Sequence, residues 1–109
     1  MTIWRRGSNV EGYRIAGHAL ARREGEEFDL VCAAVSSIAY TALYGLQEYL
    51  GIQLQRKRIK DGLMEVVLPQ DLPEKTRLQA DAILEAMLLG LTAVAESYPR
   101  HVKVETKEV

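Results

Sequence analysis

The sequence has little of the residues that usually mark a disulfide-stabilised scaffold, a metal site or a nucleotide site. Its single cysteine, Cys32, cannot form a disulfide within the chain, which argues against a secreted scaffold and indicates a reducing compartment. The only two histidines, His18 and His101, are far apart in sequence and lack the Cys/His spacing of a metal site. No glycine-rich phosphate loop of the G-x-G-x-x-G or G-K-[ST] type occurs. We therefore expect neither a metal nor an organic cofactor.

Strong net charge and long apolar runs are also absent. Fourteen basic residues stand against fifteen acidic ones, so the net charge is −1, and we expect no direct nucleic-acid binding and no membrane partner. The longest nearly apolar run, AILEAMLLGLTAVA, is interrupted by Glu85 and is shorter than a bilayer span, and the N-terminus is too polar for a signal peptide. With 109 residues, 48% of them hydrophobic and 27% charged, the chain is predicted to be one cytoplasmic globular domain, 1–109.

Apolar periodicity and turn residues divide the chain into seven elements. Gly-Ser-Asn at 7–9 favours a turn, and Asp-Gly at 61–62 is a hairpin signal. Apolar residues at steps of three and four predict two helices, the first capped by Asp29 and ended by Gly51. The predicted strands are 2–6, 10–19, 52–59, 63–69 and 101–109, and the predicted helices are 30–50 and 74–97. The order ββαββαβ predicts a two-layer α+β domain, with two helices packed on a largely antiparallel sheet.

The stretch GHALARREGEEFDLVCAAVSS contains the residues of the candidate site. If Asp29 caps the helix, Cys32 occupies its first turn, where unpaired amides and the positive end of the helix dipole stabilise a thiolate or an oxyanion. His18 ends the preceding strand, and the charged loop 20–28 is long enough to bring His18 to Cys32 as its base. Gly17 has no side chain to obstruct a substrate. These features predict a thiolate–imidazolium pair with a loop that gates access.

Each of these residues also has an ordinary structural interpretation. A cysteine in an alanine-rich helix is commonly buried packing, and a histidine at a strand end is commonly a surface or hydrogen-bonded residue. Asp29 is interpreted as a cap in preference to a third catalytic group that orients His18. Ser36, one turn after Cys32, either bonds the carbonyl four residues earlier or contacts substrate. The basic cluster QRKRIK at 55–60 is interpreted as a solvated sheet edge, with RNA or an acidic partner as the alternative.

Three motifs in the chain are similar to those of the ribosomal-processing cysteine protease (Prp) family. They are Gly-His-Ala at 17–19, the run DLVCAAVS at 29–36, and the pattern G-L-x-x-V-x-x-x-Y-P-x-x-V-x-V at 90–104. The resemblance covers nearly the whole chain, and it aligns His18 with the family's histidine and Cys32 with its nucleophile. It implies a homodimeric, cofactor-free cysteine endopeptidase. The implied substrate is the large-subunit ribosomal protein that bears the number twenty-seven, from which a short N-terminal extension is removed.

Phe28 departs from the family pattern, because family members often have glycine immediately before the aspartate. We interpret Phe28 as a hydrophobic staple over the helix start, with a stiffened loop hinge or an aromatic contact to substrate as alternatives. Two other functions are compatible with these residues. One is a non-catalytic ribosome-associated binding module in which Cys32 is packing. The other is a redox-sensing thiol, although the chain has no second cysteine to resolve it.

Overall fold

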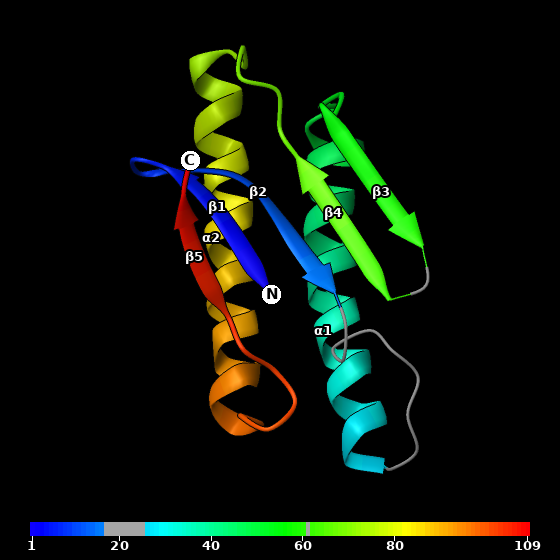
Figure 1. The fold of residues 1–109 in the computed structure, drawn as a ribbon. Helices are drawn as coiled ribbons and strands as arrows, with labels where there is room; N and C mark the ends of the chain where they lie inside the picture. Colours follow the sequence, from blue (N-terminus) through cyan, green and yellow to red (C-terminus); the bar gives the residue numbers. More distant parts are fainter. Residues whose placement is uncertain (17–25, 61) are drawn as a thin grey trace.

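Two helices lie side by side on one face of a single sheet, and none of the described residues forms a helix on the other face (Figure 1). This arrangement is seen in a computed structural model that describes residues 1–16, 26–60 and 62–109, with the backbone alone for 26–29. The elements of these residues are β1 Thr2–Arg6, β2 Asn9–Ala16, α1 Glu26–Tyr44, the π-helical η2 Gly45–Tyr49, β3 Arg56–Lys60, β4 Leu63–Val67, α2 Glu74–Ser97 and β5 Glu105–Glu108. The predicted two-layer α+β fold and the order ββαββαβ are confirmed.

The strands follow the order β3-β4-β2-β1-β5 across the sheet. All neighbouring pairs are antiparallel except β1 and β5, which are parallel. The β1–β2 turn contains Gly7 at φ +59°, and Lys60 pairs with Leu63 across a two-residue turn in which Gly62 has φ +74°. Both turns were predicted, because glycine adopts positive φ without steric cost.

The core lies between the sheet and the helices, and the spacing of apolar residues along each strand or helix determines which side chains are buried there. Alternate residues of a strand point to the same face, so the fully buried apolar side chains of the sheet lie on the side that faces the helices. Those fully buried from the sheet are Ile3, Val10, Tyr13, Ile15, Met64 and Val66. The helices contribute residues at steps of three and four, which are Val31, Val35, Ala39, Ala42, Leu43 and Leu46 from α1 and η2, and Ala80, Leu84, Met87 and Leu91 from α2.

The first helix differs from its prediction at its start but not at its end. It begins at Glu26, three residues before the predicted cap Asp29, because the acidic residues that looked like loop are residue types favoured in a first helical turn. At the other end the helix widens into η2, where the Leu50 amide donates to the carbonyl of Gly45, five residues back. Gly51, at φ +65°, then ends the helix as predicted.

Three strands are shorter than predicted. The strand β4 ends at Val67, two residues before its predicted end, and β3 and β5 are shortened because the chain beside them takes part in a helix end. The Ile52 amide donates to the carbonyl of Leu46, and Ile52 is buried, so the strand expected from residue 52 begins only at Arg56. After α2, the amides of His101 and Val102 both donate to the carbonyl of Tyr98. This turn delays β5, so that the last strand has four residues and not nine. The helix α2 has its predicted bounds.

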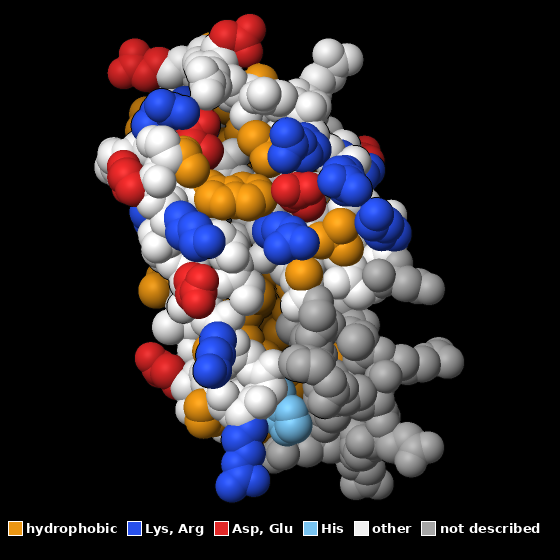
Figure 2. Space-filling view, in the orientation of Figure 1, with side chains coloured by type: hydrophobic (Ala, Val, Ile, Leu, Met, Phe, Trp, Pro, Cys, Tyr) orange, Lys and Arg blue, Asp and Glu red, His pale blue; other side chains and the backbone are white. Residues whose placement is uncertain are grey.

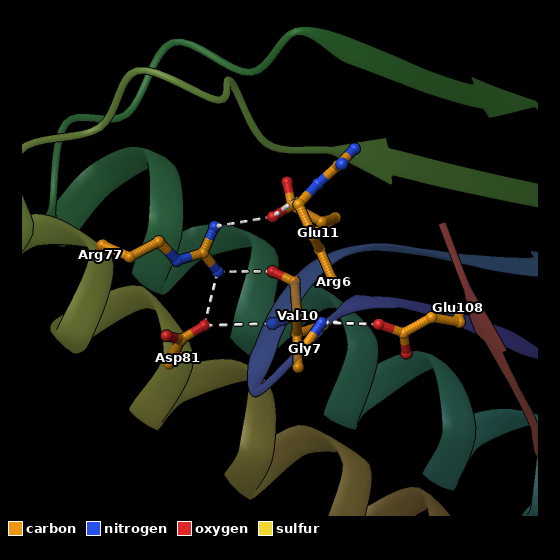
Figure 3. A network of polar contacts seen from close by, with 7 residues as sticks. All are labelled: Arg6, Gly7, Val10, Glu11, Arg77, Asp81 and Glu108. Carbon is orange, nitrogen blue, oxygen red and sulfur yellow. Dashed lines mark hydrogen bonds and ion pairs between the residues drawn. The ribbon is translucent and has the colours of Figure 1, made fainter.

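A polar network fixes the β1–β2 hairpin to α2 (Figure 3). The Arg77 guanidinium donates to the carboxylate of Asp81 and to the carbonyl of Val10, and it also faces the carboxylate of Glu11. Asp81 in turn accepts a hydrogen bond from the Val10 amide at 3.2 Å. On the other side of the turn, the Gly7 amide donates to Glu108 Oε1 at 2.6 Å. The network holds β2, the strand that leads toward His18, in place against α2.

Both helices are longer apolar stretches than expected from the sequence, whose longest nearly apolar run, interrupted by Glu85, is shorter than a bilayer span. By length and composition alone, Leu30–Tyr49 and Glu74–Ser97 are each long and apolar enough to cross a membrane. In this fold both lie against the sheet (Figure 1). Only 33% and 22% of the two stretches is buried, however, so much of their apolar surface faces outward.

Candidate active site

Cys32 lies on α1 beside the stripe of residues that the helix buries, not within it. The neighbouring members of that stripe are Val31 and Val35, which are 1% and 0% exposed. One residue along a helix is a rotation of about 100°, and Cys32 is half-buried and stands outside the core cluster. The interpretation of Cys32 as core packing is therefore weakened, since the helix anchors it while leaving part of it at the surface.

The side of α1 that carries Cys32 faces the β3 edge of the sheet. Ser36 and Tyr40 follow Cys32 at steps of four on that side, and both are half-buried. Further along the same side, Gln47 Oε1 of η2 accepts a hydrogen bond at 3.0 Å from Lys57 Nζ of β3. The opposite side of α1 lines a groove against α2. The candidate nucleophile thus lies on the flank of the helix that α2 does not cover.

The position of Cys32 along the helix corrects the prediction about its activation. Cys32 comes six residues after Glu26, or about 9 Å along the helix axis, and so lies in the second turn. The effect of the helix dipole falls off within the first turn, and an amide in the second turn has a carbonyl partner four residues back. The N-cap position assigned to Asp29, and the unpaired amide assigned to Cys32, are therefore wrong. The helix dipole alone is consequently a weak source of thiolate stabilisation at Cys32.

The same helix start corrects the interpretation of Phe28. A hydrophobic staple requires a residue just before the N-cap, whereas Phe28 is the third residue of α1. Loop 20–28 is likewise shorter than predicted, because its last three residues belong to the helix. Gly17 and His18 lie outside the described residues, as does 20–25.

The strand β2 ends at Ala16, two residues before His18, and it points toward the end of the molecule at which α1 begins (Figure 1). The final pairs of β2 with β4, Ile15 with Met64 and Ala16 with Leu63, fix this end of the strand beside the β3–β4 hairpin. Ile15 and Met64 are both fully buried, which anchors the strand in the core up to its last residue. The strand β2 is thus firmly held up to Ala16.

Tyr13 is a buried polar residue that links β2 to α1, and the sequence did not single it out. Its hydroxyl donates to the carbonyl of Ala39 on α1 at 3.2 Å. Burial raises the pKa of the Tyr13 phenol far above its ordinary value, and the proximity of Tyr40 raises it further. Tyr40 also lies against Tyr44, with ring centroids 5.9 Å apart. Strand alternation predicts the burial of Tyr13, but no sequence signal predicts its partner on the helix.

Metal chemistry gains no support from the part of the chain that the structure describes. No group of three or more His, Cys, Asp or Glu side chains there is arranged to hold a metal ion. What the site offers chemically is a half-buried thiol on a helix, beside a strand that leads to a histidine. That combination of nucleophile and base is the one used in thiol-dependent acyl transfer.

The model of a known protein family, cysteine protease Prp, matches residues 1–103. The chain belongs to this family. The match confirms the family resemblance seen in the motifs around His18 and Cys32, and with it the expectation of a cysteine protease. Among curated proteins, no sequence matches the chain closely enough to count as a relative.

Solved structures share the fold over nearly its full length. SMU.848 from Streptococcus mutans superposes with a TM-score of 0.80 at 29% identity, over 99% of this chain and 92% of that one. The ribosomal processing protease Prp from S. aureus, in complex with a substrate peptide, gives 0.80 at 18% identity over 97% and 96% of the two chains. The same S. aureus protease with a covalently linked product peptide gives 0.79 at 20% identity over the same shares.

Proposed function

We propose that this Prp-family protease uses His18 and Cys32 as a catalytic dyad. We further propose that it removes a short N-terminal extension from the large-subunit ribosomal protein numbered twenty-seven, in the cytoplasm. The observation that carries the proposal is the family match across residues 1–103, together with the half-buried position of Cys32 at the edge of the core stripe. The solved S. aureus relatives were crystallised with a substrate peptide and with a covalently linked product peptide. Covalent attachment to a peptide is the chemistry expected of a cysteine nucleophile.

In the proposed mechanism, the His18 imidazole takes the proton of Cys32, and the thiolate attacks the carbonyl carbon of the scissile bond. His18 then protonates the leaving amine as the C–N bond breaks, and a thioester remains on Cys32. Water attacks the thioester and releases the new carboxyl group. The unpaired amides nearest to Cys32 along the chain are those of the first helical turn, 26–29, and these are the proposed oxyanion donors.

Asp29, Ser36 and Phe28 have secondary parts in this proposal. Asp29 precedes Cys32 by three residues on the same helix, so it remains a candidate to orient His18, now as a residue of the first turn and not as a cap. Ser36 follows Cys32 by one turn on the uncovered flank of α1, and Phe28 precedes it by one turn. We propose that both border the substrate, with Gly17 leaving room for its backbone.

The test is cleavage of a synthetic peptide that spans the processing site of the extended ribosomal protein from the same cell. We expect Cys32→Ala and His18→Ala each to lower kcat/KM by about 10³-fold or more. Ser36→Ala is the comparison variant on the same flank: Ser36 is proposed to border the substrate but takes no part in bond making, so this change should lower kcat/KM by less than about tenfold. Cleavage that persists in Cys32→Ala would refute the dyad. Binding of intact peptide by the wild type without cleavage would favour the non-catalytic binding module.

The pH dependence of thiol alkylation separates the dyad from a redox-sensing or inert thiol. A dyad predicts that Cys32 reacts with iodoacetamide well below the ordinary thiol pKa, and that His18→Ala shifts the reaction toward higher pH. Asp29→Asn should give a smaller shift in the same direction only if Asp29 orients His18. An alkylation profile that is the same in wild type and His18→Ala would contradict the assignment of His18 as the base.

We also propose that the protein is a homodimer in which the outer surfaces of the helices face each other. A groove of about 510 Å³ runs between α1 and α2, and small residues that include Gly45 and Gly90 line it. Beside it on α2, Leu78 and Leu89 are 65% and 71% exposed. Together with the groove, these two leucines form an exposed apolar patch on the outer face of the helices, and such patches commonly mark protein–protein contacts. Because the groove and Cys32 lie on opposite sides of α1, this mode of pairing leaves the Cys32 flank open.

Analytical ultracentrifugation of the wild type and Leu89→Glu tests the dimer. We expect a dimer for the wild type and a monomer, or a dissociation constant raised by about 100-fold, for Leu89→Glu. Ile59→Glu, which places the same charge on the exposed hairpin strand β3, should leave the dimer intact. A wild type that sediments as a monomer at micromolar concentration would refute the proposal.

A further inference from the structure

The face of the sheet that carries no helix is basic, although the chain as a whole is slightly acidic. Register assigns the side chains to faces, because paired residues on neighbouring strands point the same way. Arg56, Arg58 and Lys60 of β3 point to this open face together with their partners on β4. Arg14 of β2, which pairs with Glu65, and Lys107 of β5, which pairs with Trp4, point to the same face. Arg6 lines a hollow on the same face. The net charge of −1 therefore conceals a segregation of charge that the fold creates.

Among the described residues of the open face, the acidic groups are fewer than the basic ones, and two of the three already face arginines. Glu65 is 7% exposed and lies under two arginines, with Arg56 at 3.5 Å and Arg58 at 3.8 Å. Glu11 is 8% exposed and faces the guanidinium groups of Arg6 and Arg77. Glu105, across from Thr2, is the remaining one. The side chains of Arg56 and Arg58 are 57% and 55% exposed, so both can still contact an anion from solvent.

An aromatic residue lies at the centre of these cations. Trp4 pairs with Gly12 on one side and with Lys107 on the other, and its ring covers the space that a side chain at position 12 would fill. Together with Val67, Trp4 lines a hollow of about 200 Å³ with Arg6 and Arg56 on its border. Figure 2 looks on to this face and shows an apolar patch in its middle, with several basic side chains and some acidic ones around it.

We propose that the open face of the sheet binds single-stranded RNA, with Trp4 stacking on a base and the surrounding cations contacting phosphates. The cations occur on four of the five strands, from β3 at one edge to β5 at the other. Four strand spacings of about 4.8 Å make this span about 19 Å, which suits a polymer with repeated phosphates better than a single small anion. Sheets that bind single-stranded nucleic acid combine the same two features, an aromatic stacking residue and a cationic surface along the backbone.

An acidic peptide is the competing ligand, and the composition of the face favours RNA. A peptide ligand would be recognised by charge alone, and nothing in that recognition requires an indole at the centre of the cations. Arginines outnumber lysines on this face by four to two, and the planar guanidinium group both pairs with phosphate through two bonds and stacks on bases. The RNA proposal goes beyond the protease activity and does not depend on it.

Fluorescence anisotropy of a labelled single-stranded RNA of about 12 nucleotides tests the proposal with full-length protein. For three to four phosphate contacts, the plot of log K against log salt should have a slope of about −2 to −3. Arg56→Gln/Arg58→Gln should make this slope shallower by about 1.4, and should weaken binding by about tenfold or more near 50 mM salt. Arg14→Gln/Lys107→Gln should act in the same way, and it leaves the cover of Glu65 by Arg56 and Arg58 intact.

The matched control changes the same number of charges on the other side of the molecule. Lys57 is on β3 too, but it bonds Gln47 on the helix side, and Lys75 is on α2. Lys57→Gln/Lys75→Gln should therefore bind RNA within about twofold of the wild type. Trp4→Leu, which keeps an apolar cover over Gly12, should weaken binding by about fivefold or more at unchanged salt slope.

Three outcomes would overturn the proposal. One is the absence of binding near 50 mM salt. Another is a loss of affinity in Lys57→Gln/Lys75→Gln equal to that in the two open-face variants, which would mean non-specific attraction. The third is competition in which a polyglutamate peptide of equal charge displaces RNA as well as unlabelled RNA does, which would assign the face to an acidic peptide. Peptide cleavage by the open-face variants should equal that of the wild type, which separates this result from a failure of the proposed dyad.

Discussion

Gly12 is the position at which the smallest possible substitution should do the most damage to the fold. A Cβ added there falls on the carbonyl oxygen of Val66, closer than carbon and oxygen can approach, and 3.0 Å from the Cα of Val67. The ring of Trp4 closes the space from the other side, with an atom at 3.3 Å. The two nearest obstacles are backbone atoms of a central strand, so no rotation of a side chain can relieve the contact.

The expected loss of stability for Gly12→Ala is at the upper end of the range for overpacking, about 3 kcal/mol. A domain of this size has a free energy of unfolding of about 5 to 15 kcal/mol, so a large share would be lost. At about 4 °C per kcal/mol, the melting temperature should fall by about 12 °C. The sheet relaxes only by separating β2 from β4, which would also shift the strand that leads to His18. Activity measured well below the melting temperature should therefore fall too.

Gly90→Ala is the control, because a Cβ there meets only the end of the Ile38 side chain at 3.4 Å, an ordinary contact. Alanine is favoured over glycine inside a helix by up to about 1 kcal/mol, so Gly90→Ala should melt up to about 4 °C higher. Thermal unfolding followed by circular dichroism measures both variants. A melting temperature for Gly12→Ala within about 2 °C of the wild type would show that β2 and β4 are not held as closely as the contact requires.

Three further predictions concern the residues that hold the helices to the sheet. Folding raises the pKa of the Tyr13 phenol, so the stability that the neutral phenol contributes is present below the pKa of the unfolded chain, about 10. Above that pH the free energy of unfolding should fall by about 1.4 kcal/mol per pH unit. Urea titrations at several alkaline pH values should show this loss in the wild type and not in Tyr13→Phe. Arg77→Met should lower the free energy of unfolding by about 2 to 4 kcal/mol, because it leaves the buried Glu11 without the Arg77 cation and removes the hydrogen bond to the Val10 carbonyl. An unchanged urea midpoint would show that the polar network around Arg77 contributes nothing to stability. Gly51→Ala should cost about 1 to 2 kcal/mol, since alanine is strained at φ +65°, and a stability equal to that of the wild type would contradict this.

The sequence was sufficient for the fold because each element carried its own local signal. The period of α2 and the turn glycines, at 7 and 62, depend only on neighbouring residues, and these predictions were confirmed. The errors came where a long-range bond decides a boundary. The amide of Ile52 is used by the end of the first helix and not by a strand, and no pattern within 52–59 reveals this. The parallel pairing of β5 with β1 is likewise a property of the whole sheet.

At the candidate site, too, the residue types were predictable from the sequence and the element boundary was not. Cysteine and histidine, with the motifs around them, were enough to predict a cysteine protease, and the family match confirms that class. The helix start was not predictable from composition, because Glu26 and Glu27 suit an exposed loop as well as a first helical turn. An error of three residues there moved Cys32 from the first turn to the second. In the proposed mechanism, a histidine and not the helix dipole then stabilises the thiolate.

The groove between α1 and α2, the Cys32 flank of α1 and the open face of the sheet lie on different sides of the molecule, and this separation follows from the two-layer fold. The helices cover one face of the sheet, so the cationic residues of the other face cannot touch them. Within the helix layer, α1 presents the groove with α2 on one flank and Cys32 on the other, because a rotation of about 100° per residue separates neighbouring positions. A second copy on the groove and RNA on the open face would therefore both leave Cys32 accessible to a peptide. Along the chain, the open face comes nearest to the candidate dyad on β2, where Arg14 precedes His18 by four residues. We therefore expect bound RNA to alter peptide cleavage through this strand. Arg14→Gln is then the variant in which bound RNA should cease to alter KM for the peptide, with Lys107→Gln as the control that lies farther from His18.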